Sequence, residues 1–399
     1  MRALITGSGA REHALAWKIS QSPLLEKLYL WGANDGFCEL GEIIEAKNIQ
    51  ELAKIAATKK IDIAIVGPEN QLAEGIVDIL QDAGIFCIGT NKFWTQLESS
   101  KLFAKKFMQK YDIKTAKYEI ITDNNIPKIP FPVVLKADGL CGGKGVIIAK
   151  TETETKKIIA EYLGGKFGEA SKTIIAEEFL DGEEISLISL FDGKTLLPFI
   201  PARDFKKLEN GDKGPNTGGM GAYCPIKLTE NQKLKLESFI KTLENSLLTE
   251  NADFTGIIYS GLIWAQDDFY LLEFNMRFGD PETQALMMHL ESDLLELFGL
   301  CIKRKLHKAK LQWKKGISGC LTIATKGYPE KFPRDTSIGK IPDEVQTFFA
   351  GVKKTPELKS NGGRVLSLCY TSEQPYDKIY ESAEKLEFKD KFYRTDIKC

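Results

Sequence analysis

The stretch LLEFNMRFGDPETQ, residues 271–284, has the pattern of a β-strand that ends in a Gly-Asp-Pro-Glu turn. Successive side chains of a strand alternate between its two faces, so Glu273, Asn275 and Arg277 share one face, each about 7 Å from the next. A charged strand face is often merely solvated, but two oxygen ligands and a guanidinium beside an acidic turn indicate a functional face. The opposite face is apolar and carries Leu272, Phe274, Met276 and Phe278.

The three polar side chains suit a hard cation beside an anionic substrate. Mg²⁺ prefers oxygen ligands and is often held by one or two protein groups together with substrate phosphates. Glu273 and Asn275 are therefore candidate metal ligands, for Mg²⁺ or Mn²⁺. Arg277 is a candidate for bidentate binding of a carboxylate or phosphate, which a lysine cannot imitate.

The composition is that of a large globular protein. The chain has 399 residues, 43% of them hydrophobic, which favours two to four compact units. Its 54 basic and 55 acidic side chains give a formal net charge of −1. Because the chain has almost no net charge to attract nucleic acid or an anionic membrane, we expect neither as a partner.

Cysteine usage and apolar runs together predict a cytoplasmic location. The eight cysteines are scattered, without a CxxC pair or a zinc motif, as in a reduced compartment. No apolar run approaches the roughly 20 residues that span a bilayer. The apolar stretch at the N-terminus is too short for a signal peptide.

The first part of the chain predicts an α/β domain with a doubly wound parallel sheet, residues 1–98, because strand and helix patterns alternate. The expected strands are 2–6, 28–31, 61–66 and 85–88, and the expected helices are 10–20 and 71–83.

The remaining residues predict a core, a lid and a C-terminal domain. The α+β lid, residues 118–184, has expected strands 118–121, 131–136, 145–149 and 173–179 and helix 152–163. The core, residues 99–117 and 185–312, has expected helices 101–110 and 230–249, strands 185–191, 196–201, 256–265 and 269–278, and a glycine-rich loop at 211–223. The α+β C-terminal domain, residues 313–399, has expected strands 319–325 and 364–370 and helix 377–386.

The lid contains a glycine-rich flap, GLCGGKG at residues 139–145. Glycines let backbone N–H groups approach phosphate oxygens, and Lys144 adds positive charge. The flap is not a Walker loop, because Val146 follows where a Ser or Thr would open a helix. A plain flexible hairpin is the alternative. Lys136 on the preceding apolar strand favours a phosphate site, because a buried lysine needs an anionic partner.

Two further motifs give weaker signals. The backbone at Glu178 to Leu180 leaves a strand through a hinge and is placed to bind the edge of a base, although an ordinary acidic turn is more common.

Residues 7–13, GSGAREH, match half of a dinucleotide fingerprint, but Glu12 replaces the third glycine, which argues against a dehydrogenase. The helix N-terminus and Arg11 favour a monophosphate there, and His13 is expected to be a structural contact.

Taken in order, the flap, the hinge and the Glu-x-Asn-x-Arg strand resemble the ATP-grasp enzymes, and within them the phosphoribosylamine–glycine ligase family. The resemblance extends from end to end. It implies an N-terminal domain, an ATP-grasp core with its lid and a C-terminal domain. It also implies that ATP, glycine and 5-phosphoribosylamine give glycinamide ribonucleotide, ADP and phosphate through glycyl phosphate, in purine biosynthesis. The motifs are GSGAREHALAWK (7–18), KADGLCGGKGV (136–146), EEFLDGEE (177–184), GPNTGGMGAY (214–223), RFGDPETQ (277–284) and NGGRVL (361–366).

The resemblance further implies roles for individual residues. ATP would be bound by Lys101, Lys136, Gly139, Gly142, Gly143, Lys144, Gly145, Glu177, Glu178, Phe179, Leu180 and Glu184. The metal would be bound by Glu273 and Asn275. The glycine side would be formed by Arg277, Asp204, Gly218, Gly219 and Asp280, and the phosphoribosyl side by Gly9, Arg11, Pro68 and Glu69. The catalytic side chains would be Arg277, Lys136 and Lys144.

Two departures from the family pattern and two rival functions stay open. The neighbouring strand, residues 259–262, offers no second acidic ligand, which leaves the number of metal ions open. Phe205 stands where the family commonly has histidine. Another ATP-grasp carboxylate–amine ligase and a nucleotide-binding protein without turnover are the alternatives. We expect a monomer that hands its product to neighbouring purine-pathway enzymes.

Overall fold

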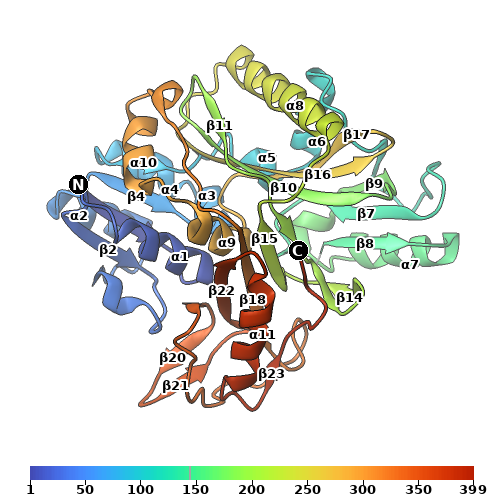
Figure 1. Ribbon diagram of the computed structural model, residues 1–399. Coiled ribbons are helices and arrows are strands. Elements are labelled where there is room, and N and C mark those ends of the chain that lie inside the picture. The colour runs from blue at the N-terminus through green and yellow to red at the C-terminus, as the bar shows by residue number, and fades with distance from the viewer. Residues whose placement is uncertain (143–144) are drawn as a thin grey trace.

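The computed structural model describes residues 1–142 and 145–399. Gly143 and Lys144, two of the expected phosphate contacts, lie outside the described residues. In Figure 1 the N-terminal domain (blue) lies at the left, the lid with α7 and β8 at the right, and the C-terminal domain (red) at the bottom. The α/β fold class predicted from the sequence is confirmed, with its parallel N-terminal sheet, ATP-grasp core and C-terminal domain.

The N-terminal domain is a five-stranded parallel sheet of order β3-β2-β1-β4-β5. The inner residues of its central strands, residues 3–5 and 63–66, are apolar, because helices cover both faces. Ala3 and Ile5 pack with α1 on one face, and Leu4 packs with α2 and α4 on the other. The elements are β1 (Arg2–Thr6), α1 (Ala10–Ile19), β2 (Lys27–Trp31), η1 (Cys38–Leu40), β3 (Glu42–Ile43), α2 (Ile49–Thr58), β4 (Ile63–Val66), α3 (Glu69–Glu74), α4 (Ile76–Asp82) and β5 (Phe86–Ile88).

The core is an antiparallel sheet of order β11-β10-β16-β17. On one face, side chains such as Leu187 and Leu271 pack against α5, α6 and α8. On the other face, Ile188 and Ile257 pack with α9 and α10, toward the N-terminal domain. The elements are α5 (Gln96–Ser99), α6 (Lys101–Lys110), β10 (Glu183–Phe191), β11 (Leu196–Pro198), α8 (Glu230–Thr249), β16 (Gly256–Ala265), β17 (Asp268–Asn275), α9 (Glu282–His289), α10 (Leu294–Ile302) and η3 (Leu306–Lys308).

The lid is a four-stranded sheet of order β6-β9-β7-β8 with one helix on it. Val133, Leu135 and Ala137 of β7 pack with Ile159 of the helix α7. Because strand side chains alternate, Lys136 points to the opposite face, away from α7. The elements are β6 (Tyr118–Ile121), β7 (Val133–Ala137), β8 (Val146–Ala149), α7 (Glu152–Leu163), η2 (Gly168–Ser171) and β9 (Ile174–Glu178).

The C-terminal sheet has the order β12-β15-β18-β22-β19, with β23 paired to β18. Two of its strands come from the middle of the chain, so the sheet crosses the expected boundary at residue 313. The prediction of a loop over 211–223 was wrong, because two strands form within it. The elements are β12 (Arg203–Asp204), β13 (Lys207–Glu209), β14 (Lys213–Asn216), β15 (Gly221–Cys224), β18 (Ile317–Thr325), β19 (Gln346–Phe349), β20 (Val352–Lys354), β21 (Leu358–Ser360), β22 (Arg364–Ser372), α11 (Pro375–Lys385) and β23 (Lys391–Phe392).

Local irregularities explain two further differences from the prediction. The single helix expected at 71–83 is divided at Gly75, which has φ +89°. The strand expected at 269–278 ends at Asn275, and a register shift opposite Gly261 and Leu262 interrupts its alternation. None of the helices in the described part of the chain is long and apolar enough to be a membrane span.

Candidate active site

The end of β17 carries the two candidate metal ligands. Glu273 pairs with Gly261 of β16, and Asn275 pairs with Tyr259. The irregularity in β17 places Leu272 with the apolar cluster of Leu180, not on the face of Phe274 as expected. Within the described residues, the side chain of Glu273 makes no hydrogen bond or ion pair, so its carboxylate is available to a cation.

Arg277 follows the strand and is held by two carboxylates from other elements. Its Nε lies 3.3 Å from Oε2 of Glu69, and its Nη2 lies 3.1 Å from Oε1 of Glu98. It also donates to Oδ1 of Asn275 (3.2 Å) and to the carbonyl of Phe278 (3.2 Å). Burial opposes the charge, but Glu98 and Glu69 outweigh it and raise the pKa of Arg277. The guanidinium therefore joins the N-terminal domain to the core.

Two of the predicted phosphate lysines lie near this strand: Lys136 contacts it directly, whereas Lys101 contacts the lid and interacts electrostatically with Glu273. Lys101, at the start of α6, donates to the carbonyl of Gly139 (3.1 Å), and burial lowers its pKa. Lys136 donates to the carbonyl of Leu272 (3.1 Å) and lies 2.9 Å from Glu177. The structure thus brings Lys101, Lys136 and the Glu273 strand together.

The flap glycines Gly139, Gly142 and Gly145 are placed where a side chain would be costly. A Cβ at Gly139 would lie 2.5 Å from Cβ of Ala170, and one at Gly145 would lie 2.8 Å from Cβ of Cys141. Gly142 has φ +55°, in the left-handed region that glycine adopts readily. The backbone is closely packed at Gly139, against Ala170 of η2, and at Gly145, against Cys141 of the flap itself.

The hinge residues divide into inward and outward side chains. Glu177 is 1% exposed and faces lysines, whereas Glu178 accepts from the backbone N–H of Lys117 (2.8 Å). Phe179 is 40% exposed, and Leu180 packs in an apolar cluster with Ala116 and Ile263. Glu178 is therefore engaged with Lys117 twice, because its backbone N–H also donates to the carbonyl of Lys117 (2.9 Å), and a base would be left with the carbonyl of Glu178 and the backbone of Phe179 and Leu180.

A partly buried charge cluster lies beside the hinge, built around Lys206. Its Nζ lies 2.7 Å from Glu184 and 3.7 Å from Asp204. Lys206 lowers the pKa of Glu184, whereas burial raises the pKa of Asp204 to about 7. Glu184 is 44% exposed at its side chain and Asp204 7%, so Glu184 is the more accessible of the two.

A buried acid, Glu282, extends this cluster toward the start of α9. Its Oε1 accepts from Ser186 (2.9 Å), whose hydroxyl also lies 2.9 Å from that of Tyr259. Glu282 is 2% exposed, so it supports neighbouring side chains and does not face the solvent. No group of three or more His, Cys, Asp or Glu side chains in the described residues is arranged to hold a metal ion alone.

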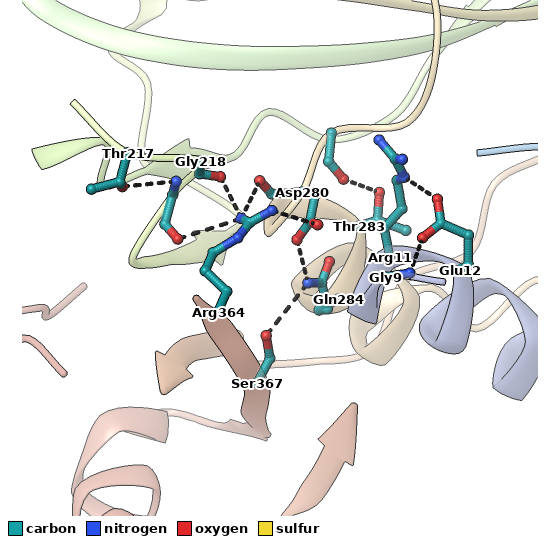
Figure 2. Close-up of polar contacts among 12 residues, drawn as sticks. Gly9, Arg11, Glu12, Thr217, Gly218, Asp280, Thr283, Gln284, Arg364 and Ser367 are labelled. Carbon is teal, nitrogen blue, oxygen red and sulfur yellow. Dashed lines mark hydrogen bonds and ion pairs between the residues drawn. The ribbon is translucent and has the colours of Figure 1, made fainter. Parts of the chain in front are cut away.

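The C-terminal domain reaches the turn after β17 through Arg364. Its Nη2 lies 2.8 Å from Oδ2 of Asp280, and its Nη1 donates to the carbonyls of Asp280 (3.1 Å) and Gly218. Figure 2 shows Arg364 between the Gly218 loop and the Asp280 turn, with Gln284 linking Asp280 to Ser367. Arg364 thus connects two of the predicted glycine contacts.

The N-terminal candidates lie beside the same turn. Arg11 is 7% exposed, lies 2.6 Å from Glu12 and donates to the carbonyl of Phe278 (3.1 Å). Glu12 also accepts from the N–H of Gly9 (2.7 Å), so the chain's own carboxylate occupies the N-terminus of α1. Pro68 is the N-cap residue of α3, and Glu69, the first residue of that helix, forms an ion pair with Arg277.

Three family models together match nearly all of this chain. They describe the N domain, the ATP-grasp (A) domain and the C domain of phosphoribosylglycinamide synthetase, over residues 1–98, 99–283 and 318–398. A phosphoribosylamine–glycine ligase from Fusobacterium nucleatum is 39% identical, with 100% of this chain and 98% of that protein covered. The chain belongs to the phosphoribosylamine–glycine ligase family. It is therefore an ATP-grasp ligase of purine biosynthesis.

Other ligase relatives agree in sequence and in structure. The trifunctional purine biosynthetic protein adenosine-3 of Drosophila melanogaster is 39% identical over 99% of this chain, which spans 31% of that protein. The crystal structure of phosphoribosylamine–glycine ligase from Thermotoga maritima superposes with a TM-score of 0.85 at 31% identity, covering 100% of both chains. A biotin carboxylase domain from Hydrogenobacter thermophilus, at 16% identity and TM-score 0.71 over 98% of this chain and 91% of that one, shares the fold alone.

Several residues of this ligase site were not among those predicted from sequence. Glu98 holds Arg277, Arg364 holds the Asp280 turn, and Glu282 supports the Ser186 and Tyr259 hydroxyls. A glutamate within a helix or an arginine within a strand carries no local sign of such long-range contacts. The motifs NGGRVL, which contains Arg364, and RFGDPETQ, which contains Glu282, were the available signals.

Proposed function

We propose that this chain joins glycine to 5-phosphoribosylamine through glycyl phosphate, between the lid, the end of β17 and the Asp280 turn. A glycine carboxylate oxygen attacks the γ-phosphorus of ATP, and the bond to the β-phosphate oxygen breaks to leave ADP. The phosphoribosylamine nitrogen then attacks the glycyl carbonyl carbon, loses a proton and releases phosphate. The observation that carries this proposal is that Lys136 contacts the Glu273 strand, Arg277 follows it, and Lys101 lies near enough to interact electrostatically with Glu273.

The residues present fit a divalent cation, Mg²⁺ or Mn²⁺. Glu273 offers a carboxylate without a protein partner in the described chain, and Asn275 offers an amide oxygen. Because two protein ligands are few, the remaining ligands would be ATP oxygens and water, which is the usual arrangement for Mg²⁺. The cation would offset the negative charge that develops on the transferred phosphoryl group.

Lysines and the hinge would position ATP. Lys101 and Lys136 face the strand end and would balance phosphate charge, together with the flap at Gly139 and Gly142. The backbone of Glu178 to Leu180 would contact the adenine edge, and Glu184 would accept from a ribose hydroxyl. The lid would then exclude water, which protects an acyl phosphate from hydrolysis.

The two other substrates would meet at the turn after β17. Arg277 would hold the glycine carboxylate, with Asp204, Gly218, Gly219 and Asp280 around it. Gly9, Arg11, Pro68 and Glu69 would contact the phosphoribosylamine. Since Glu69 already lies 3.3 Å from Arg277, the two substrate sites would be adjacent, as attack of the amine requires.

The direct test is ADP release with ATP, glycine and freshly prepared phosphoribosylamine, against omission of each. We expect stoichiometric ADP and glycinamide ribonucleotide only when all three are present. Equal ADP release without glycine, or with glutamate in its place, would overturn the proposal. Comparing Mg²⁺ with Mn²⁺ in the same assay identifies the preferred cation.

We further propose that the protein acts as a cytoplasmic monomer. Its ligand candidates all come from one chain, so no second subunit is needed to complete the site. Light scattering after size exclusion should give a mass near 44.6 kDa, and a mass near twice that value would refute the monomer.

A further inference from the structure

Lys105 is a buried lysine next to the ATP site for which the proposed reaction gives no role. It lies on α6, one helical turn after Lys101, and is 2% exposed. Its Nζ donates to Oγ1 of Thr115 (2.7 Å) and lies 5.4 Å from the ring centre of Tyr118, at the start of the lid. A buried ammonium group is costly unless a charge partner compensates it.

The compensating partner of Lys105 is Glu177, which it shares with Lys136. Oε1 of Glu177 lies 3.1 Å from Lys105, and Oε2 lies 2.9 Å from Lys136. Side-chain exposure is 2% for Lys105, 2% for Glu177 and 8% for Lys136. Water therefore screens this row of three charges poorly.

The row carries a net charge of +1, and its order determines where that charge acts. If Glu177 faced Lys136 alone, the two would form a neutral pair and little field would reach a phosphate. Because Lys105 lies against the other carboxylate oxygen of Glu177, Lys105 neutralises the negative charge of Glu177. Lys136, which also reaches the carbonyl of Leu272 beside Glu273, then keeps its charge toward the strand end.

We propose that Lys105 is a positioning residue for ATP, which neutralises and fixes Glu177 so that the charge of Lys136 remains available to the ATP phosphates. This rests on the proposed role of Lys136. It also changes the expected role of Glu177 from contacting ATP to bridging two lysines. Burial lowers the pKa of Lys105 to about 8, in keeping with a group whose charge depends on Glu177.

A purely structural role for Lys105 is the competing explanation. Thr115, which accepts from Lys105, donates to the carbonyl of Leu271 (2.6 Å), so the lysine also fastens α6 to β17. Loss of that fastening would lower stability, whatever the charge of residue 177. A charge-compensating double variant separates the two explanations.

The test measures binding of a non-hydrolysable ATP analogue with Mg²⁺ by calorimetry, alongside thermal unfolding. Lys105→Met leaves Glu177 and Lys136 as a neutral pair, so we expect Kd to rise by about tenfold or more. Lys105→Met combined with Glu177→Gln restores the net charge of +1. We therefore expect the double variant to bind within about threefold of the wild type, although it lacks the same lysine. Lys105→Arg, which keeps the charge, should also bind like the wild type.

The outcomes are exclusive. If Lys105→Met binds as tightly as the wild type, or if the double variant binds no better than Lys105→Met, the positioning role is wrong. If Lys105→Met does not fold, the double variant decides alone, since it restores the net charge of +1 that Lys136 carries without Glu177. A wild type that fails to bind the analogue would instead refute the proposed ATP site, which keeps the two failures distinct.

Discussion

Arg277 has more partners than its strand position suggested. From the sequence it was expected to hold the glycine carboxylate, yet Glu69 and Glu98 already lie within 3.3 Å and 3.1 Å of it. Two carboxylates around one guanidinium leave a net negative charge, so a third carboxylate would bind only if one of them moved or gained a cationic neighbour. Glu69 is the more movable, because it is 34% exposed at its side chain against 5% for Glu98.

This arrangement predicts opposite effects of Glu69→Gln on the two substrates. Loss of the carboxylate removes a competitor for Arg277, so the KM for glycine should fall, by about threefold. The KM for phosphoribosylamine should rise if Glu69 contacts its amine. Steady-state kinetics with each substrate varied measures both values. Glu74→Gln, an exposed position on the same helix, is the matched control, and a raised KM for glycine would contradict the competition.

Glu273 is expected to be essential for turnover and dispensable for folding. Glu273→Gln keeps the size of the side chain but removes the charge that a divalent cation needs, so kcat should fall by about 100-fold or more. ADP release measures the rate, and thermal unfolding should change little because no described residue forms a hydrogen bond or ion pair with the carboxylate of Glu273. Glu237→Gln on the exposed side of α8 is the control. Near wild-type activity would remove Glu273 from the metal site.

At the scale of elements, local sequence patterns predicted the regular helices and strands well. They predicted poorly the irregular segments, whose conformation depends on packing. The helix at 230–249 and the strands at 118–121 and 256–265 have the bounds that periodicity and turn residues indicated. The irregularity in β17 was missed because Leu272 is as apolar as its neighbours, and its position depends on Leu180 from the hinge. Lys136, Glu273 and Asn275 could be proposed from local motifs, whereas Glu98 and Arg364 could not.

The glycine-rich segment shows what local composition leaves out. Five glycines in the eleven residues 211–221 predicted a loop, but β14 forms within it by pairing with the neighbouring β13, and β15 begins at its end by pairing with the distant β18. Gly221 pairs with Leu321 of β18 and therefore lies in the C-terminal sheet. Tertiary pairing thus overrides a weak local preference.

Gly219 in this segment is expected to tolerate no side chain. It has φ +107°, and a Cβ would lie 2.3 Å from Cδ of Pro281, next to the predicted substrate contact Asp280. Gly219→Ala should therefore lower kcat/KM for glycine by about tenfold or more and destabilise the protein by about 2 kcal/mol. Gly84→Ala is the matched control, because Gly84 has φ +80° but no atom within 4 Å of a Cβ. Equal effects of the two substitutions would show that backbone strain alone matters.

At the scale of the molecule, the site exists because three domains meet at the Asp280 turn. Arg364 joins the turn to the C-terminal domain, and Arg11 joins the neighbouring carbonyl of Phe278 to the N-terminal domain. The N-terminal and C-terminal domains also contact each other at His13, which stacks between Phe37 of the first and Phe349 of the second; we call this contact the His13 joint. His13 was expected to be structural, and its Nδ1 indeed accepts from the N–H of Phe349 (2.9 Å).

This joint should weaken in acid. Burial lowers the pKa of His13 from 6.5 to about 3, so the folded protein keeps it neutral while the unfolded chain takes up a proton below about pH 6.5. The contribution of His13 to stability is thus complete above pH 6.5 and is lost as the pH falls toward 3. At pH 4.5 the loss should be about 2.7 kcal/mol, at 1.36 kcal/mol per pH unit.

The variant His13→Asn tests this, because its amide oxygen can accept from Phe349 but does not titrate. It should be less stable than the wild type at pH 8, having lost the stacked ring, yet lose about 2 to 3 kcal/mol less between pH 7 and pH 4.5. Urea unfolding at several pH values measures the difference, in which the common titration of carboxylates cancels. The exposed His307→Asn is the control. If the wild type and His13→Asn lose stability in parallel, His13 is not the acid-sensitive group of this joint, and the buried carboxylates around the Asp280 turn become the groups to examine.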